Sequence, residues 1–201
     1  MPTDWTEIMR REEELLSCER CIRESRGDPV SPQPSWIGES YQTGGVAFVL
    51  QNPGETPSKL GDRDRRLAGP LERFMRTGGV VAYSALRDEA TAQMLGTDGL
   101  GLWPSWAQPI RHCVAQCLEP SKLAWLNTVR HRTPQHAPLT RSQRLHGLTH
   151  LEDMLSVLSP ATVVTVGNPA RDSLGKQAIR ALAHSSHQAK GSVYPRLPSL
   201  A

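Results

Sequence analysis

Three short apolar runs, each followed by a turn or a polar loop, constrain the fold of this chain more than any other feature. They cover residues 46–50, 123–129 and 161–166. A continuous apolar run of this length is typical of a strand that is buried on both faces of a sheet. Segments with helical periodicity separate the runs, and this alternation predicts an α/β fold. We expect a three-layer α/β/α arrangement in which a central, mainly parallel four-stranded sheet is flanked by helices.

Helical segments are expected at residues 4–21, 70–75 and 84–95, and from residue 141 onward. Asp4 can cap the first of them, with Glu7 three positions later, and Thr140 and Gln143 form the same capping-box pattern before the last. After the third apolar run, residues 167–169 (Gly-Asn-Pro) predict a tight turn and the start of a further helix.

The length and charge of the chain suit one compact domain over residues 1–201, with a formal net charge of +3. Within it we expect a long loop at residues 22–45 and an insertion at residues 96–122. No apolar run approaches the roughly 20 residues that cross a bilayer, and the N-terminus shows no secretory signal. These features predict a cytoplasmic monomer with no membrane attachment. The mildly basic charge permits nucleic acid as a partner without requiring it.

Polar residues follow the apolar runs, at the places where an α/β sheet carries its ligand site. Ligands of such sheets bind outside the carboxyl ends of the strands, so these loops hold the candidate site residues. The residues concerned are Gln51, Asn52, Pro53, Gly54, Asn127, His184, Ser185, Ser186 and His187.

These residues form three motifs that resemble those of the uracil-DNA glycosylase superfamily. Residues 49–54 (Val-Leu-Gln-Asn-Pro-Gly) are similar to the first active-site motif, with a core most like that of the mismatch-specific and single-strand-selective branches. Residues 126–129 (Leu-Asn-Thr-Val) are similar to the strand-end Asn motif, and residues 184–186 (His-Ser-Ser) to the His-Pro-Ser motif with its proline replaced. The resemblance covers residues 14–187.

The resemblance implies a monofunctional DNA glycosylase. Such an enzyme flips a pyrimidine, either uracil or a 5-substituted base, out of DNA and hydrolyses its N-glycosidic bond, which leaves an abasic site. Base excision repair and defence against modified viral DNA are both compatible roles. Two alternatives share the fold: a covalent uracil-DNA-binding protein, in which His131 would be the reactive residue, and a non-catalytic nucleic-acid-binding relative.

The resemblance also implies a role for each motif residue. Asn52 is expected to orient the attacking water, and His184, with His187 as its substitute, to donate to the pyrimidine O2 as negative charge develops there. Asn127 would bind the edge of the base, and the two serines after His184 would bind DNA phosphates. The plainer interpretations are a turn-capping Asn52 and an Asn127 that satisfies local backbone groups.

Two positions depart from the family in a way that enlarges the predicted pocket. Gly54 stands where the strict uracil enzymes have a tyrosine that excludes 5-substituents, and Leu67 stands near the expected position of the stacking aromatic residue. Gln51 and Pro53 complete the expected substrate-binding residues. A roomier pocket favours a 5-substituted pyrimidine as the substrate.

Four cysteines form two close pairs, Cys18-x2-Cys21 and Cys113-x3-Cys117. Without a secretory signal, such pairs indicate metal ligands or reduced thiols rather than disulfides. The first pair is similar to the N-terminal Cys-x2-Cys of the superfamily's iron–sulfur branches. Their third ligand would fall at residues 130–131, and their fourth on the next helix, which here has no cysteine. We expect the four cysteines together to hold a structural zinc ion or an iron–sulfur cluster, with four reduced thiols as the alternative, and no cofactor for catalysis.

Overall fold

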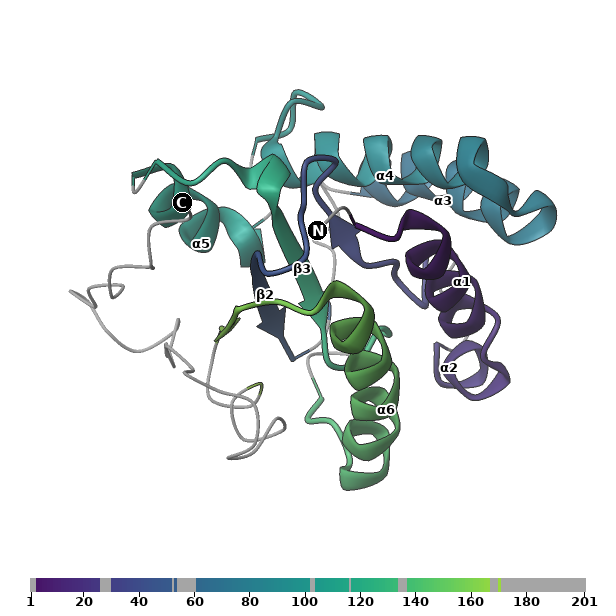
Figure 1. Cartoon of the computed structure of the whole chain (residues 1–201). Coiled ribbons are helices and arrows are strands. Elements are labelled where there is room, and N and C mark those ends of the chain that lie inside the picture. The colour runs from purple at the N-terminus through teal and green to yellow at the C-terminus, as the bar shows by residue number, and fades with distance from the viewer. Residues whose placement is uncertain are drawn as a thin grey trace.

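The computed structural model (Figure 1) describes residues 3–25, 30–51, 53, 61–101, 104–115, 117–133, 137–166 and 170. Its elements along the chain are α1 (Trp5–Leu16), α2 (Glu19–Glu24), β1 (Trp36–Ile37), β2 (Val46–Leu50), α3 (Gly61–Thr77), α4 (Gly79–Leu95), α5 (Pro104–Ala115), the 3-10 turn η2 (Pro120–Lys122), β3 (Leu123–Asn127), α6 (Arg141–Leu158) and β4 (Thr162–Thr165). The elements are those of an α/β fold, as the apolar runs predicted. Among the described helices, none combines the length and the apolar character that a bilayer span needs.

The strands form one four-stranded sheet in the order β1-β3-β2-β4. β2 pairs in parallel with β3 on one side and with β4 on the other, and Val49 lies opposite both Leu126 and Thr165. These three strands coincide with the apolar runs, so the mainly parallel sheet is confirmed. β1 is antiparallel to β3, with Trp36 opposite Trp125.

β1 lies inside the segment that was predicted to be a long loop. Residues 22–45 also include the last turn of α2, which ends at Glu24. The prediction of an unbroken loop is therefore wrong. Two residues are too few to show the alternating pattern of a strand in the sequence. β1 is a strand because it pairs with β3. Residues 96–122, expected to be an insertion, contain α5 and η2.

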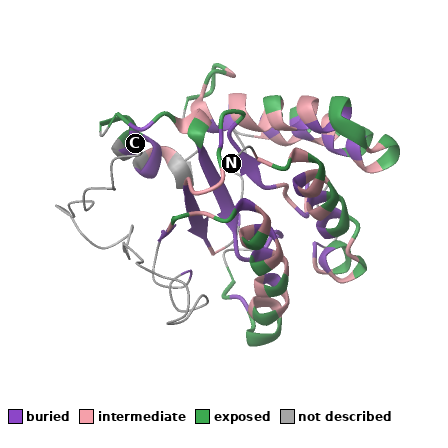
Figure 2. Cartoon of the chain, viewed as in Figure 1, coloured by how far each residue is buried: buried purple, intermediate pink, exposed green. Residues whose placement is uncertain are grey.

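Side chains of the strands alternate between two hydrophobic clusters, and the buried strands lie in the middle of the molecule (Figure 2). Ala47 and Val49 face a cluster that also contains residues of α1, α3, α4 and α6. Phe48 faces the other cluster, to which α5 contributes Ile110. Phe48 also stacks on Trp125 of β3, with ring centroids 4.4 Å apart. With apolar side chains on both faces of the sheet, a polar ligand reaches it at the strand ends.

The helix predicted over residues 4–21 is in fact two helices. α1 ends at Leu16, Cys18 takes an extended backbone conformation with φ −62° and ψ 111°, and α2 begins at Glu19. Asp4 caps α1 as predicted, because its carboxylate accepts from the backbone N–H of Glu7 at 3.1 Å. The break lets both cysteines of the Cys-x2-Cys pair reach α6, as described below.

α3 and α4 both begin earlier than the sequence predicted. α3 begins at Gly61 and carries Pro70 in its interior, and α4 begins at Gly79. The first turns of α3 are rich in charged residues, so the sequence there lacks the apolar periodicity that predicts a helix with a buried face. α6 begins as predicted: the Thr140 hydroxyl accepts from the Gln143 N–H at 3.2 Å, and the Thr140 N–H donates to Gln143 Oε1 at 2.9 Å.

Candidate functional site

The carboxyl ends of β2 and β3 lie side by side and are joined by backbone hydrogen bonds. Leu50 is the register partner of Asn127 in the parallel ladder. Beyond that pair, the Thr128 N–H donates to Leu50 O and the Val129 N–H donates to Gln51 O, both at 2.8 Å. The structure therefore brings Leu50 and Gln51 of the first motif next to the strand-end Asn motif.

Asn127 presents a polar atom to which no described residue forms a hydrogen bond. The residue is only 7% exposed, and its Oδ1 is buried without a hydrogen-bond partner in the described part of the chain. A buried polar atom without a partner costs about 1–3 kcal/mol, so such atoms are uncommon in folded proteins. The Asn127 carboxamide offers an acceptor and donors to a polar ligand at this edge of the sheet.

The remaining predicted site residues fall into two groups. Pro53 is described and buried, but the structure does not describe Asn52, Gly54, His184, Ser185, Ser186 and His187. Leu67 is 7% exposed and belongs to the core cluster of α1, α3, α4, α6 and the sheet, together with Leu71 and Phe74 of its own helix. Its place in the core counts against the predicted contact of Leu67 with a flipped base.

Arg130 ties the segment after Asn127 to the N-terminal part of the chain. Its side chain is 2% exposed, lies 4.0 Å from the Glu12 carboxylate and donates to the Ser35 hydroxyl. Glu12 is fully buried, and its two oxygens accept from the Ser35 N–H at 3.1 and 3.0 Å. Burial lowers the pKa of Arg130, and the Glu12 carboxylate opposes that effect. The two opposite charges thus compensate each other in the interior.

Two further ion pairs fix the beginning of α3, the helix that follows the first motif. Arg63 donates to both carboxylate oxygens of Asp98, at 2.6 and 2.9 Å, and the two side chains are 0% and 2% exposed. Arg132, in the loop after β3, donates to both oxygens of Asp64 at 2.9 and 2.8 Å. The Arg63 guanidinium holds the pKa of the Asp98 carboxyl below its usual value. α3 is therefore attached to the loop that carries the strand-end Asn motif.

A second group of functional side chains lies between α2 and α6. Cys18, Cys21, His146 and His150 each offer a metal-ligating atom, and these four atoms lie within 4.8 Å of one another. His146 Nε2 is 3.3 Å from Cys18 Sγ and 3.5 Å from Cys21 Sγ. The two imidazole rings meet edge to face, with centroids 4.9 Å apart. This Cys2His2 group could hold a metal ion.

Burial shifts the pKa of Cys21, His146 and His150 in the Cys2His2 group. Desolvation, with a contribution from Cys18, raises the pKa of the Cys21 thiol to about 12. Desolvation also lowers the pKa of His146 and of His150, so both rings are neutral near pH 7 and keep a lone pair for a metal. His150 Nε2 is buried and makes no hydrogen bond to any described residue. A bound cation would favour the Cys21 thiolate, which burial disfavours.

The predicted four-cysteine site does not form. Cys113 is fully buried in the cluster with α5, on the face of the sheet opposite α6, and Cys117 is exposed. Two histidines join the first cysteine pair instead. The His-x3-His spacing in the predicted helix after residue 141 was the signal for them, because residues four apart share one face of a helix.

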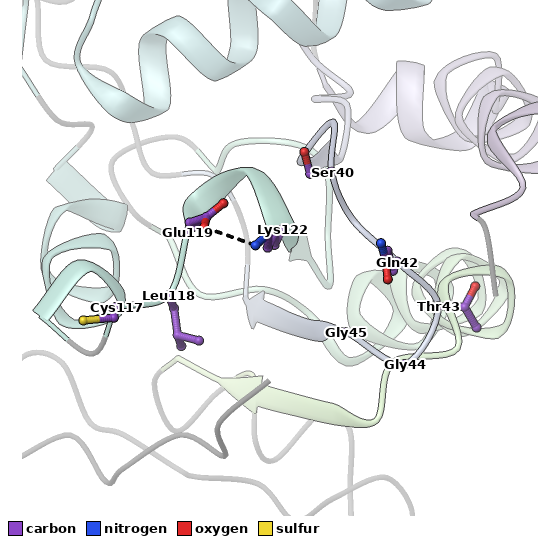
Figure 3. Close-up of a pocket in the computed structure, with 9 residues that line it drawn as sticks. All are labelled: Ser40, Gln42, Thr43, Gly44, Gly45, Cys117, Leu118, Glu119 and Lys122. Carbon is purple, nitrogen blue, oxygen red and sulfur yellow. Dashed lines mark hydrogen bonds and ion pairs between the residues drawn. The ribbon is translucent and has the colours of Figure 1, made fainter. Parts of the chain in front are cut away.

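The amino ends of the strands carry a separate polar pocket of about 320 Å³ (Figure 3). It is lined by Ser40, Gln42, Thr43, Gly44, Gly45, Cys117, Leu118, Glu119 and Lys122. The Lys122 ammonium and the Glu119 carboxylate form an ion pair at 3.1 Å on its wall. The pocket lies at the end of β2 and β3 opposite Asn127, so it is not part of the candidate site.

A comparison of the sequence with protein-family models and with curated proteins finds no match. The function therefore has to be inferred from the carboxyl edge of the sheet around Asn127. The Cys2His2 group is a second, separate feature of the same molecule.

Gly147 allows α6 to approach the loop after Asn127. A Cβ at this position would lie 2.3 Å from the backbone oxygen of Thr128, which a shift of one side chain cannot relieve. Gly147→Ala is expected to lower the free energy of unfolding by about 2 kcal/mol, measured by urea denaturation. Thr149→Ala, at an exposed position of the same helix, is the control and should change it by less than about 0.5 kcal/mol. Equal effects of the two substitutions would contradict the importance of this close approach.

Proposed function

We propose that this protein is a DNA glycosylase that binds a flipped-out pyrimidine at the carboxyl ends of β2 and β3 and hydrolyses its N-glycosidic bond. The observation that carries the proposal is the buried Oδ1 of Asn127, which has no partner among the described residues and lies beside Gln51, the first residue of the sequence Gln51-Asn52-Pro53-Gly54. The resemblance of the three motifs to the uracil-DNA glycosylase superfamily supplies the reaction. DNA is the proposed partner.

A pyrimidine carries the groups that Asn127 needs. Uracil and its 5-substituted derivatives have an N–H between two carbonyl groups, so the carboxamide can accept from that N–H and donate to the neighbouring oxygen. Binding of the base would give Oδ1 the hydrogen bond that it lacks among the described residues. Polar groups that are already desolvated discriminate strongly against ligands that cannot pair with them.

In the proposed reaction, the bond between the base nitrogen and the sugar C1′ breaks, and its electron pair leaves with the base. A water molecule oriented by Asn52 adds to C1′, and the proton that it loses neutralises the departed base anion. His184 donates to the pyrimidine O2, where negative charge develops. The reaction needs no covalent intermediate and no catalytic cofactor.

The proposal includes the three-layer α/β/α arrangement. Its support is that α5 lies on one side of the sheet and α1, α3, α4 and α6 on the other (Figure 1), with a hydrophobic cluster at each face. In this arrangement, DNA would meet the edge of the sheet where the loops after β2 and β3 emerge.

The covalent alternative has less support, because the position of His131 is enclosed. This residue is 2% exposed, and its Nε2 lies 3.1 Å from Gln143 Nε2 and 3.7 Å from Glu24 Oε2. Burial also lowers its pKa. A nucleophile has to reach the sugar C1′ of a bound nucleotide, so a ring held between α6 and α2 favours hydrolysis over covalent trapping.

Oligonucleotides that carry uracil, a mismatched thymine or a 5-substituted pyrimidine test the proposal. Each is incubated with the protein in single- and double-stranded form, and abasic sites are detected by alkaline cleavage. We expect cleavage of at least one substrate, and a loss of at least about 100-fold in rate with Asn52→Ala at nearly unchanged DNA binding. A protein–DNA adduct that survives a denaturing gel would support the covalent alternative. DNA binding without formation of any abasic site would support the non-catalytic alternative.

A further inference from the structure

We infer that Cys18, Cys21, His146 and His150 hold one structural zinc ion, in place of the iron–sulfur cluster that the resemblance implies. The inference does not depend on the proposed glycosylase activity. It rests on the spacing of the donor atoms, on their chemical types and on the His150 nitrogen that has no partner among the described residues.

The spacing of the donor atoms fits one tetrahedral ion. Zn–S bonds of about 2.3 Å and Zn–N bonds of about 2.05 Å place a sulfur and a nitrogen of one tetrahedron roughly 3.6 Å apart. His146 Nε2 lies 3.3 Å from Cys18 Sγ and 3.5 Å from Cys21 Sγ. All four ligand atoms lie within 4.8 Å of one another, so small rotations of the side chains close the tetrahedron.

An iron–sulfur cluster needs a different set of donors. Most such clusters bind four thiolates, and only two cysteines belong to this group. Two-iron clusters with two cysteines and two histidines place the thiolates on one iron and the imidazoles on the other. Cys18 Sγ and His146 Nε2 would then bind different irons, and the bridging sulfides would keep these two atoms farther apart than two ligands of a single ion. The observed distance between them is only 3.3 Å. The residues therefore do not fit a cluster.

The ligand set is that of a closed, structural site. Cys-x2-Cys with His-x3-His has the spacing of structural zinc sites, and four protein ligands leave no open position for a substrate. Zinc would also satisfy His150 Nε2, which is buried without a partner among the described residues.

The ion would join two parts of the chain that are far apart in the sequence. The cysteines lie at the start of α2 and the histidines on α6, and Gly147, between the two histidines, packs against Thr128. Zinc would thereby hold α6 against the loop that follows Asn127. Loss of the ion should destabilise the protein without removing any group from the candidate active site.

Metal analysis of the full chain is the first test. The protein is expressed with both zinc and iron in the medium, purified without oxygen and analysed by mass spectrometry of its metals. We expect about one zinc ion per chain, and chelation of the zinc should lower Tm by about 10 °C. Iron with equivalent sulfide, or a folded protein without bound metal, would overturn the inference.

Cobalt substitution tests the individual ligands. Co²⁺ in a tetrahedral thiolate site has strong visible bands and a thiolate-to-metal charge-transfer band. His150→Cys adds a third thiolate, so it should retain the ion and raise the charge-transfer band by about half. His150→Ala should weaken zinc binding by at least about 100-fold. Cys117→Ser is the matched thiol control and should alter neither property. An unchanged spectrum in His150→Cys, or weaker metal binding in Cys117→Ser, would overturn the ligand assignment.

Discussion

Asn127→Ala is expected to lower kcat/KM for base excision by about 100-fold while the protein remains as stable as the wild type or becomes slightly more stable. The loss of activity follows because the carboxamide would pair with the base. Stability is retained because Oδ1 has no hydrogen-bond partner in the described part of the chain. Truncation therefore removes a buried polar atom and breaks no hydrogen bond between Oδ1 and a described residue. Excision rates and thermal unfolding of the same preparations measure the two effects.

Thr165→Val is the matched control for Asn127→Ala. Thr165 lies on β4, which is separated from Asn127 on β3 by the strand β2; it is fully buried and has a hydroxyl oxygen without a partner among the described residues. Its replacement by the isosteric valine should also maintain or raise Tm, but it should leave excision within about threefold of the wild type. If Asn127→Ala instead lowered Tm by several degrees and left excision unchanged, Asn127 would be a structural residue that satisfies the backbone.

Asp98→Asn is expected to lower the free energy of unfolding by about 3–5 kcal/mol, because it removes the negative charge that Asp98 places against the buried Arg63 guanidinium. Both side chains are almost completely buried, at 0% and 2% exposed, and Arg63 donates to both oxygens of Asp98. Urea denaturation with a fixed m-value measures the change. Asp62→Asn, in α3 beside Arg63, is the control: the partner of Asp62, Arg65, is 76% exposed, so the loss should stay below about 1 kcal/mol.

The loss of stability caused by Asp98→Asn should become smaller as the pH falls into the acidic range. Arg63 lowers the pKa of the Asp98 carboxyl from its usual 3.8, so the ion pair stabilises the folded state fully at pH values above that number. As the pH falls through the lower pKa of the folded protein, the carboxylate is protonated and the stabilisation is lost. The difference in stability between the wild type and the variant should therefore be constant near neutral pH and narrow below about pH 4. A difference that grows at acidic pH would contradict the role of this ion pair.

The sequence alone was sufficient for the parallel strands and for the places where two helices begin. β2, β3 and β4 were predictable because a strand buried on both faces has to be apolar at every position, and that pattern is local. The starts of α1 and α6 were predictable because Asp4 and Thr140 satisfy N–H groups only three residues away. It then followed that Gln51 and Asn127 lie at the same edge of the sheet, since the carboxyl ends of parallel strands share one edge. That they are adjacent came from the pairing of β2 with β3 in the structure.

Contacts between distant segments could not be predicted in the same way. Cys18 and Cys21 were recognisable as candidate ligands from their own spacing, but the candidate ligands that the fold brings to them are His146 and His150, not Cys113 and Cys117. Leu67, expected beside the base, lies in the core because α3 begins nine residues before Pro70 and turns that side chain inward.

The sequence by itself thus determined the α/β class, the order of the parallel strands along the chain and the residues available for chemistry at their ends. Only the tertiary structure decided which face of the sheet each helix covers, that Asn127 is buried without a described partner, and that α2 and α6 bring two cysteines to two histidines. The physical reason is the range of the interactions. Periodicity and capping act over a few residues, whereas burial and ligand grouping depend on packing between segments more than a hundred residues apart.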